Sequence, residues 1–304
     1  MKENLVALID LGSNSIRLAV YKINKDQYKE VEKVKVSARL INYLDTHGKL
    51  SNKGLNLMIN TLLSFKKVID SYQISHVVGF ATAVIRQSSN QGKVLAEINK
   101  QTGFSLRVLS EYEEAYYGFV GIAHSIGLKN GITIDTGGGS TEITLFQDQK
   151  LVKYQSFPFG TITLDNAFTK GQKVNDNQKA HLKSYLMTQF QSLPWLENIS
   201  YPVIGIGGTA KSLIRIHQRK KKTNSTKMLD KDIEQLFHEV ASLPVKKRSK
   251  VKGLSNKRKD IIVPGIQTIL SLMEVTKSPY FIYSEKTIRD GVVYEEAMAR
   301  AIHK

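Results

Sequence analysis

Residues 131–146 read GITIDTGGGSTEITLF, and this stretch decides the fold of the chain. An apolar, β-branched run reaches Asp135, three glycines follow at 137–139, and polar and apolar residues alternate from Ser140 onward. The pattern predicts a strand, a tight turn and a second strand. Because glycine lacks a Cβ atom, successive amide N–H groups in such a turn can converge on an anion. The turn is a candidate phosphate-binding loop, and a plain hairpin turn is the alternative.

Hydroxyl and carboxylate side chains accompany this turn. Ser140 and Thr141 add hydroxyl donors, and Asp135 and Glu142 place two carboxylates at the same mouth. Carboxylates beside a bound phosphate would repel it unless a hard cation such as Mg²⁺ lies between them. The stretch therefore predicts a site that takes phosphate and a metal ion together.

A second copy of the pattern lies near the start of the chain, where residues 5–23 read LVALIDLGSNSIRLAVYKI. The two copies share an acid, a glycine and a serine at matching positions: Asp10 with Asp135, Gly12 with Gly137, and Ser15 with Ser140. Each copy is an apolar strand, a short polar turn and a second strand. The duplication predicts two related lobes that present phosphate loops to a shared cleft.

Length and composition indicate a folded protein of two domains. The chain has 304 residues, of which 41% are hydrophobic and 23% are charged. It has no cysteine, which excludes disulfides, thiolate metal sites and cysteine nucleophiles. No run approaches the roughly eighteen apolar residues that a membrane span needs, and the apolar run at 5–9 is too short for a signal peptide. We expect a soluble, cytoplasmic protein that does not bind a membrane.

The net charge of +17 is unevenly distributed. Residues 211–259 hold sixteen Lys or Arg against four acids, a net charge of +12. A field of this sign favours a polyanionic partner, either nucleic acid or a phosphate-rich substrate. A solvated basic surface is the alternative.

Helical and strand patterns alternate in the first half. Helices are predicted at 53–72, 91–102 and 110–125, with strands at 74–81 and 105–109, which is typical of an α/β fold. Ser110 and Glu113 form a capping box at the start of the third helix, so Glu113 has a structural role. Glu114 lies on a different face, which makes it the best local candidate for chemistry. Arg86 follows the strand at 74–81, where its guanidinium could bind phosphate.

A further glycine pair occurs in the second half. An apolar strand at 202–206 runs into Gly207 and Gly208, and a helix follows. Glycines at such a strand–helix junction admit a phosphate or allow close helix packing, and the pattern leaves both open.

Five motifs together resemble one known family. They are DLGSNS at 10–15, ATAVIR at 81–86, EEA at 113–115, DTGGGSTE at 135–142 and GIGGT at 205–209. In order and spacing they are similar to the exopolyphosphatase and guanosine pentaphosphate phosphohydrolase (Ppx/GppA) family, which belongs to the superfamily of acetate kinase, sugar kinases, Hsp70 and actin. The resemblance covers nearly the whole chain, including RKD at 258–260 and IRDG at 288–291.

The resemblance implies an α/β fold of two ribonuclease-H-like lobes with mixed sheets around a central cleft. We expect the lobes at 1–124 and 125–304, with the alternative that the last helix, at about 287–304, packs back on the first lobe. The long form of the family carries a further all-helical region, so the compact two-domain form is expected for this chain.

The resemblance also implies roles for individual residues. Glu114 would be the base that activates water, with Arg86 neutralising charge. Asp135 and Glu142 would hold Mg²⁺, with Asp10 nearby; Mn²⁺ is an alternative ion and K⁺ a possible further one. The phosphate-binding set would be Ser13, Asn14, Ser15, Gly137, Gly138, Gly139, Ser140 and Thr141, to which the glycine pair adds Gly207 and Gly208.

The leading hypothesis is an exopolyphosphatase that releases terminal phosphate from inorganic polyphosphate, because a long basic segment suits a long polyanion. Hydrolysis of guanosine pentaphosphate (pppGpp) is the alternative within the same chemistry. A non-catalytic regulator that binds phosphate or nucleotides is a weaker hypothesis, since the acidic residues are intact. Nucleic-acid binding is disfavoured because the basic stretch lacks interleaved aromatic residues. A homodimer remains open.

Overall fold

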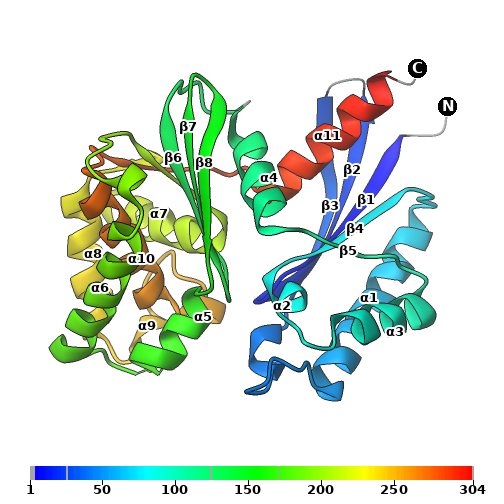
Figure 1. The fold of residues 1–304 in the computed structure, drawn as a ribbon, viewed down its shortest axis with the longest axis horizontal. Helices are drawn as coiled ribbons and strands as arrows, with labels where there is room; N and C mark the ends of the chain where they lie inside the picture. The colour runs from blue at the N-terminus through cyan, green and yellow to red at the C-terminus, as the bar shows by residue number, and fades with distance from the viewer. Residues whose placement is uncertain (1–3, 25–26, 124, 171, 303–304) are drawn as a thin grey trace. The chain divides into compact units, whose positions relative to one another are not determined.

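Two mixed β-sheets, each with its own helices, form two units of the chain (Figure 1). The computed structural model describes residues 4–24, 27–123, 125–170 and 172–302. Unit 1 consists of Met1–Gly121 and Ile288–Lys304, and unit 2 consists of Ile122–Thr287. The last helix therefore belongs to the same unit as the first strands.

Unit 1 is built on a five-stranded sheet with the order β3-β2-β1-β4-β5. Its strands are β1 (Leu5–Leu11), β2 (Ser15–Asn24), β3 (Gln27–Ser37), β4 (Val77–Ala81) and β5 (Arg107–Val108). β1 pairs antiparallel with β2 and parallel with β4, so the sheet is mixed. The strands predicted at 74–81 and 105–109 are present but shorter than expected. Pairing with β1 begins only at Val77, and only Arg107 and Val108 of β5 pair with β4.

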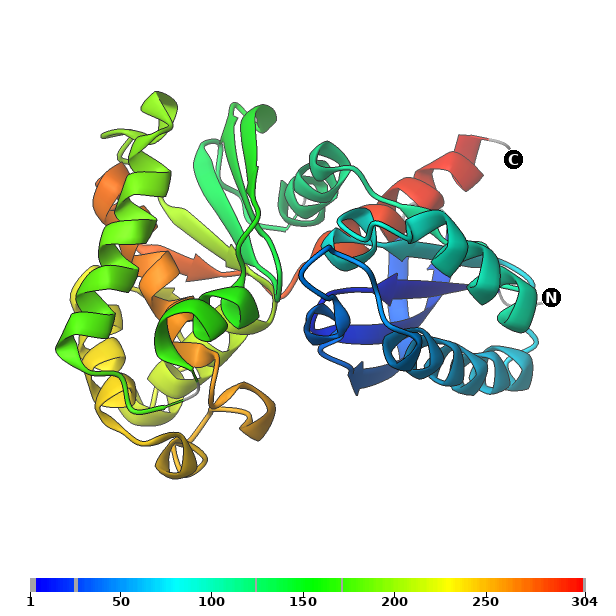
Figure 2. The ribbon, with the colours of Figure 1, turned by 60° about the horizontal axis from the view of Figure 1, so that its bottom comes forward.

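Helices cover both faces of this sheet (Figure 2). They are η1 (Leu40–Tyr43), α1 (Asn52–Ser71), α2 (Ala83–Arg86), α3 (Gln91–Thr102), α4 (Glu111–Ala123) and α11 (Ile288–Ile302). Alternate side chains of β1 point to opposite faces. Ala7 and Ile9 pack in the core that includes α1 and α3. Val6 and Leu8 pack in a second core with Val292 of α11.

Close backbone contact joins α11 to α4 within unit 1. A Cβ atom at Gly291 would overlap the carbonyl group of Tyr117, so only glycine allows this approach. The predicted helices at 53–72 and 91–102 are confirmed within one residue by α1 and α3, whose apolar faces have the expected helical spacing.

Unit 2 contains a six-stranded sheet with the order β10-β11-β9-β6-β7-β8. Its strands are β6 (Gly131–Thr136), β7 (Thr141–Gln147), β8 (Lys150–Phe157), β9 (Val203–Ile206), β10 (Lys227–Met228) and β11 (Phe281–Tyr283). β8-β7-β6-β9-β11 repeats the order and strand directions of the sheet in unit 1, and β10 adds an antiparallel edge. This repeat confirms the predicted α/β class and the duplicated lobe.

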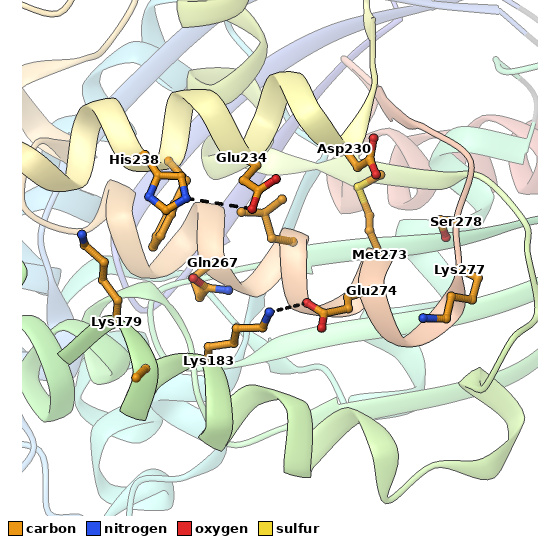
Figure 3. Close-up of a pocket in the computed structure, with 13 residues that line it drawn as sticks. Lys179, Lys183, Asp230, Glu234, His238, Gln267, Met273, Glu274, Lys277 and Ser278 are labelled. Carbon is orange, nitrogen blue, oxygen red and sulfur yellow. Dashed lines mark ion pairs between the residues drawn. The ribbon is translucent and has the colours of Figure 1, made fainter. Parts of the chain in front are cut away.

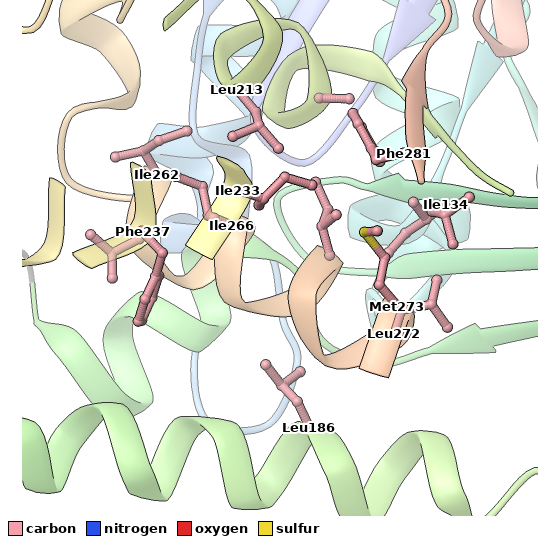
Figure 4. Packing of buried hydrophobic residues seen from close by; sticks show 14 of the residues in the cluster. Ile134, Leu186, Leu213, Ile233, Phe237, Ile262, Ile266, Leu272, Met273 and Phe281 are labelled. Atoms are coloured by element: carbon pink, nitrogen blue, oxygen red, sulfur yellow. The ribbon is translucent and has the colours of Figure 1, made fainter. Parts of the chain in front are cut away.

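The helices of unit 2 surround one long apolar helix. They are α5 (Thr161–Leu164), η2 (Asp165–Thr169), α6 (Asp176–Gln191), η3 (Pro194–Leu196), α7 (Gly207–Lys221), α8 (Asp230–Ser242), α9 (Val245–Arg248), η4 (Asn256–Arg258) and α10 (Ile262–Thr276). α10 is buried on nearly all sides, which its apolar sequence requires. Figure 4 shows Ile266 and Leu272 of α10 among Leu186 of α6 and Phe237 of α8. In the described ranges, no helix combines the length and the apolar character needed to cross a bilayer.

Candidate active site

The β1–β2 turn carries the first predicted loop. Asp10 and Arg17 are direct cross-strand partners, and Nη1 of Arg17 donates to Oδ2 of Asp10 at 2.8 Å. Asp10 is buried, with 6% of its surface exposed. The charge of this carboxylate is therefore neutralised within the hairpin.

The two predicted loops have the same hydrogen-bond pattern. The first glycine of each turn donates its N–H to the carbonyl of the serine three residues later: Gly12 to Ser15 at 3.1 Å and Gly137 to Ser140 at 2.9 Å. Carbonyl groups inside each turn accept from the segment that follows: Asn14 from Ala38, and Gly138 from Ile162. The duplication seen in the sequence is thus a duplication of backbone geometry.

The same pattern leaves amide donors in each turn. Within the described residues, the N–H groups of Ser13 and Asn14 donate to no protein acceptor, and neither do those of Gly138 and Gly139. Successive backbone N–H groups of this kind form concave sites for anions. The turns can therefore bind phosphate oxygens.

In the β6–β7 hairpin, Asp135 is the direct cross-strand partner of Glu142. The equivalent pair in the first hairpin is Asp10 and Arg17. Where the first hairpin places a cation opposite its aspartate, the second therefore places another carboxylate. Cross-strand partners of like charge are destabilising unless something lies between them. The second hairpin is the better place for a cation.

The ligand set of the second hairpin fits a hard divalent cation. Both side chains supply only oxygen atoms, and the Oγ hydroxyl of Ser156 donates to Oε1 of Glu142 at 3.0 Å. In the described part of the chain, no cluster of three or more His, Cys, Asp or Glu residues is placed to hold a metal. Two carboxylates completed by phosphate and water oxygens are a usual environment for Mg²⁺.

Gly160 packs closely against the carbonyl groups of the glycine turn. A Cβ atom at this position would lie 2.6 Å from the carbonyl carbon of Gly138, so the chain approaches the turn more closely than any other residue would allow. Thr161 adds a side-chain hydrogen bond to the carbonyl of Gly137 at 3.0 Å. The turn is therefore pre-formed by its neighbours.

The glycine pair lies beside the same carboxylate. Asp135 pairs with Ile206 of β9, and a Cβ atom at Gly207 would lie 2.6 Å from Oδ1 of Asp135. Gly207 has φ +77°, a conformation that other residues adopt only with strain. Both predictions for the pair, phosphate binding and close packing, are compatible with this position at the N-terminus of α7.

Arg258 is a further candidate site residue, which the sequence alone does not single out. Its buried guanidinium lies against Gly208, where any Cβ atom would overlap it, and Nη1 approaches the Thr209 hydroxyl at 3.4 Å. In the sequence Arg258 belongs to the RKD motif within the basic segment, and nothing in that segment distinguishes it from its neighbours. It brings a cation to the N-terminus of α7, which also favours anions.

The predicted base and the predicted arginine meet in unit 1. Nη1 of Arg86 donates to Oε2 of Glu114 at 2.5 Å and to the carbonyl of Leu109 at 2.9 Å. Glu114 is buried, with 4% of its surface exposed. The C-terminal ends of β1, β4 and β5 carry the β1–β2 turn, Arg86 and the start of α4 respectively, because these strands are parallel neighbours.

Glu113 has the structural role that the capping box predicted. Its Oε2 accepts from the backbone N–H of Ser110 at 2.8 Å, and Ser110 Oγ accepts from the N–H of Glu113 at 3.2 Å. It also forms an ion pair with Arg107. Partial burial acts to raise the pKa of Glu113, but the bonds from Ser110 and the charge of Arg107 outweigh it and lower that pKa.

Three of the predicted site regions contain a buried polar atom that has no hydrogen-bond partner in the described residues. These atoms are Asn14 Oδ1, Arg86 Nη2 and Thr136 Oγ1. Buried polar atoms without a partner are rare, and each asks for an explanation such as a missing ligand. These three lie in the first turn, beside the predicted base and at the end of β6.

A cavity of unit 2 lies away from these residues. It has a volume of about 550 Å³ and lies between α6, α8 and α10 (Figure 3). Its rim mixes both charges, including the ion pair between Lys183 and Glu274 at 2.7 Å. None of the predicted site residues lines it. The chemistry predicted from the sequence does not belong to this cavity.

Comparison with known proteins identifies the family. Residues 19–300 match the Ppx/GppA phosphatase family. The chain belongs to this family. The resemblance found in the motifs is confirmed.

Three curated relatives carry different names. A bifunctional 3-dehydroquinate synthase/phosphatase of Fusobacterium nucleatum is 26% identical over 96% of this chain and 46% of that protein. A putative exopolyphosphatase of Haemophilus influenzae is 24% identical over 95% of this chain and 90% of that protein. A guanosine-5'-triphosphate,3'-diphosphate pyrophosphatase of Vibrio vulnificus is 25% identical over 96% of this chain and 59% of that protein. The chain thus spans about half the length of the first and third relatives.

Solved structures of the family share this fold. A Ppx/GppA family member from Aquifex aeolicus has a TM-score of 0.83 and 24% identity, covering 97% of this chain and 98% of that one. An exopolyphosphatase from Cytophaga hutchinsonii has a TM-score of 0.86 and 21% identity over the same shares of both chains. At these identities the likeness concerns the fold.

Proposed function

We propose that the protein is an exopolyphosphatase, which hydrolyses the terminal phosphoanhydride bond of inorganic polyphosphate by attack of water. The observation that carries this proposal is the repeated turn geometry at 12–15 and 137–140, where successive backbone N–H groups of each loop donate to no acceptor among the described residues. Phosphoryl transfer depends on positioning and charge neutralisation more than on covalent chemistry, and two anion-binding turns supply both.

In this proposal Glu114 takes a proton from the attacking water. The carboxylate is held by Nη1 of Arg86, and Nη2 of the same guanidinium binds an oxygen of the terminal phosphate. One planar side chain thus aligns the base and the phosphoryl group, which is a use of arginine that lysine cannot copy. Arg258 adds positive charge at Gly208, beside the N-terminus of α7.

Asp135 and Glu142 would hold a divalent metal ion, Mg²⁺ or Mn²⁺, which neutralises phosphate oxygens and polarises the scissile bond when bound. Asp10 has a supporting role in this proposal, because Arg17 already neutralises its charge. The backbone and hydroxyl groups of the two turns bind the phosphates; they are Ser13, Asn14, Ser15, Gly137, Gly138, Gly139, Ser140 and Thr141.

We propose polyphosphate and not pppGpp as the substrate, because the net charge of +17 suits a long polyanion. The names of the relatives do not decide between them, since one is called an exopolyphosphatase and another a guanosine-5'-triphosphate,3'-diphosphate pyrophosphatase. Hydrolysis of pppGpp is therefore the second candidate.

The test is phosphate release from both substrates, with Mg²⁺ and with a chelator in its place. We expect metal-dependent release from polyphosphate at a higher kcat/KM than from pppGpp. The opposite order would make the nucleotide the substrate. Binding of either compound without release would indicate a non-catalytic regulator.

A further inference from the structure

A second cavity of unit 2 lies at the C-terminal end of α7 and has a volume of about 460 Å³. We call it the basic pocket. Its lining consists of Ile216, Arg219, Lys220, Glu239, Leu243, Lys247, Lys250, Val251 and Lys252. Five cationic side chains face one carboxylate there, which leaves a net charge of +4. The volume is in the range of about 300–1,000 Å³ that small-ligand pockets occupy.

The positive charge of the basic pocket is not compensated within unit 2. Lys220 forms the ion pair with Glu239. Arg219, Lys247, Lys250 and Lys252 make no ion pair with any described residue. Basic residues in the last turn of a helix stabilise its dipole, which accounts for Arg219. Lys250 and Lys252 follow α9 and have no such role.

The wall that carries these lysines is held firmly in place. Arg248 is fully buried, and its guanidinium donates to the carbonyls of Val240 at 3.0 Å and Gln172 at 2.8 Å. At Gly253 the chain has φ +95°, and a Cβ atom would lie 2.5 Å from the carbonyl oxygen of Arg215. The segment therefore packs directly on the backbone of α7. The backbone that carries these lysines is therefore fixed, which reduces the cost of binding a ligand.

A basic stripe along α7 connects the basic pocket with the glycine pair. Lys211, Arg215 and Arg219 are spaced four residues apart and therefore share one face of the helix. The helix begins at Gly207 and ends at Lys221. Its fifteen residues span roughly 22 Å at 1.5 Å per residue. The stripe thus leads from one proposed phosphate-binding position to the other end of the helix.

We propose that the basic pocket and this stripe anchor the distal part of a polyphosphate chain while its end is hydrolysed at the glycine turns. The inference rests on the proposed function and extends it with a binding site outside the catalytic centre. The ligand is a flexible polyanion and not a nucleic acid, because no aromatic side chain lines the pocket to stack on a base. A chain too short to span α7, such as tripolyphosphate, does not reach the pocket.

The test compares two variants with equal charge loss. One is K247Q/K250Q/K252Q in the basic pocket. The other is K67Q/K100Q/K153Q, three exposed lysines outside it. Retention of long-chain inorganic polyphosphate by each variant is measured as a function of NaCl concentration. A chelator is present, so that no turnover occurs. Kinetics with Mg²⁺ then follow on long-chain polyphosphate and on tripolyphosphate, and circular dichroism verifies that both variants fold.

Loss of three charge contacts is expected to reduce the slope of log K against log salt by about 2, at roughly 0.7 per contact. We expect KM on long-chain polyphosphate to rise about tenfold or more on the same grounds. Values of kcat, and both constants on tripolyphosphate, should match those of the control variant.

Equal retention and equal KM in the two variants would overturn the proposal. So would a pocket variant that loses retention of duplex DNA while keeping that of polyphosphate, which would assign the pocket to nucleic acid. Because retention is measured without turnover, it tests polyphosphate binding at the basic pocket even if the protein hydrolyses pppGpp and not polyphosphate.

Discussion

Nη1 of Arg86 lies 2.5 Å from Oε2 of Glu114, while Nη2 of the same guanidinium is buried without a hydrogen-bond partner in the described residues. One edge of the guanidinium therefore holds a carboxylate and the other edge is available to an anion. In a phosphohydrolase this arrangement places the base and the phosphoryl oxygen on one rigid plane. The roles of Glu114 and Arg86 can be tested separately, because each residue has a replacement of similar size: glutamine for Glu114 and lysine for Arg86.

Replacement of Glu114 by glutamine should abolish the base and keep the shape. The amide oxygen can still accept from Arg86, but the guanidinium loses its counter-charge, so the thermal unfolding temperature should fall. We expect kcat to fall by about 10²–10⁴-fold, the usual contribution of a general base. Phosphate release at saturating substrate is the measurement.

The matched control for this variant is Glu113→Gln, one residue away. It weakens the capping box and should cost about 1 kcal/mol of folding free energy, while kcat below the unfolding transition stays near that of the parent. If the two variants lost activity equally, Glu114 would not be the base.

Replacement of Arg86 by lysine tests the two-edged role of the guanidinium. Lysine keeps a positive charge near Glu114 but has no second edge for a phosphate oxygen. Loss of one hydrogen bond to a charged group, about 1.5–3 kcal/mol, corresponds to a drop in kcat/KM of about 10- to 100-fold. The unfolding temperature should fall less than in Arg86→Ala, which removes the cation beside a buried carboxylate. Full activity in Arg86→Lys would show that only the charge matters.

Asp135→Asn tests the metal site through stability. The change removes one of the two carboxylates proposed to hold the metal ion. The parent should gain about 2.7 kcal/mol at a Mg²⁺ concentration of one hundred times Kd, and the variant should lose this gain. Thermal unfolding with Mg²⁺ and with a chelator measures both effects.

Asp10→Asn is the counterpart in the first hairpin. The amide oxygen can still accept from Arg17, but the ion pair is lost, so the unfolding temperature should fall to the same extent with or without Mg²⁺. An Asp135→Asn protein that kept the Mg²⁺-dependent gain would place the metal elsewhere.

Gly160→Ala should distort the glycine turn. The new methyl group would meet the carbonyl carbon of Gly138 at 2.6 Å, and backbone atoms cannot move aside cheaply. We expect lower stability together with a rise in KM, because the N–H groups of the turn lose their alignment. Gly92→Ala in α3 is the control, since no atom lies within 4 Å of its Cβ position. That change should stabilise the protein by about 0.5–1 kcal/mol, the helix preference of alanine over glycine.

His217 should make the stability of unit 2 depend on pH. Its burial in α7 lowers its pKa, although the charge of Asp232 acts in the opposite direction. The folded state therefore keeps the ring neutral, while the unfolded chain takes up a proton below a pH of about 6.5. The stabilisation is complete above that pH and is lost as the pH falls from there toward the lowered pKa. His217→Asn should flatten urea unfolding profiles between pH 7 and 5.

Local patterns accounted for much of the fold and for part of the site. The two strand–turn–strand segments, α1, α3 and the capping box of α4 depend on side-chain periodicity and on residues three or four positions apart. The match between Gly12 and Gly137 was visible in the sequence because both turns repeat the same residues at the same steps, and a Cβ atom at either glycine would lie only 3.2 or 3.3 Å from a serine carbonyl oxygen. The distinction between Glu113 and Glu114 followed from a cap, which is also a local interaction.

Strand pairing decided what the sequence left open. Arg86 and Glu114 meet because β4 and β5 are parallel neighbours, and Arg258 reaches Gly208 although fifty residues of chain separate them. The last helix joined unit 1 because it packs on β1, β2 and β3 and makes a close contact with α4.

The sequence by itself determined the two turns, their acids and their glycines, because these rest on the conformational limits of neighbouring residues. Only the tertiary structure showed that Arg17 neutralises Asp10 while Glu142 opposes Asp135. It also gathered part of the basic segment into a pocket at the end of α7. Such charge partners are set by register and packing between distant segments, and their free energies depend on distances that the order of residues does not contain.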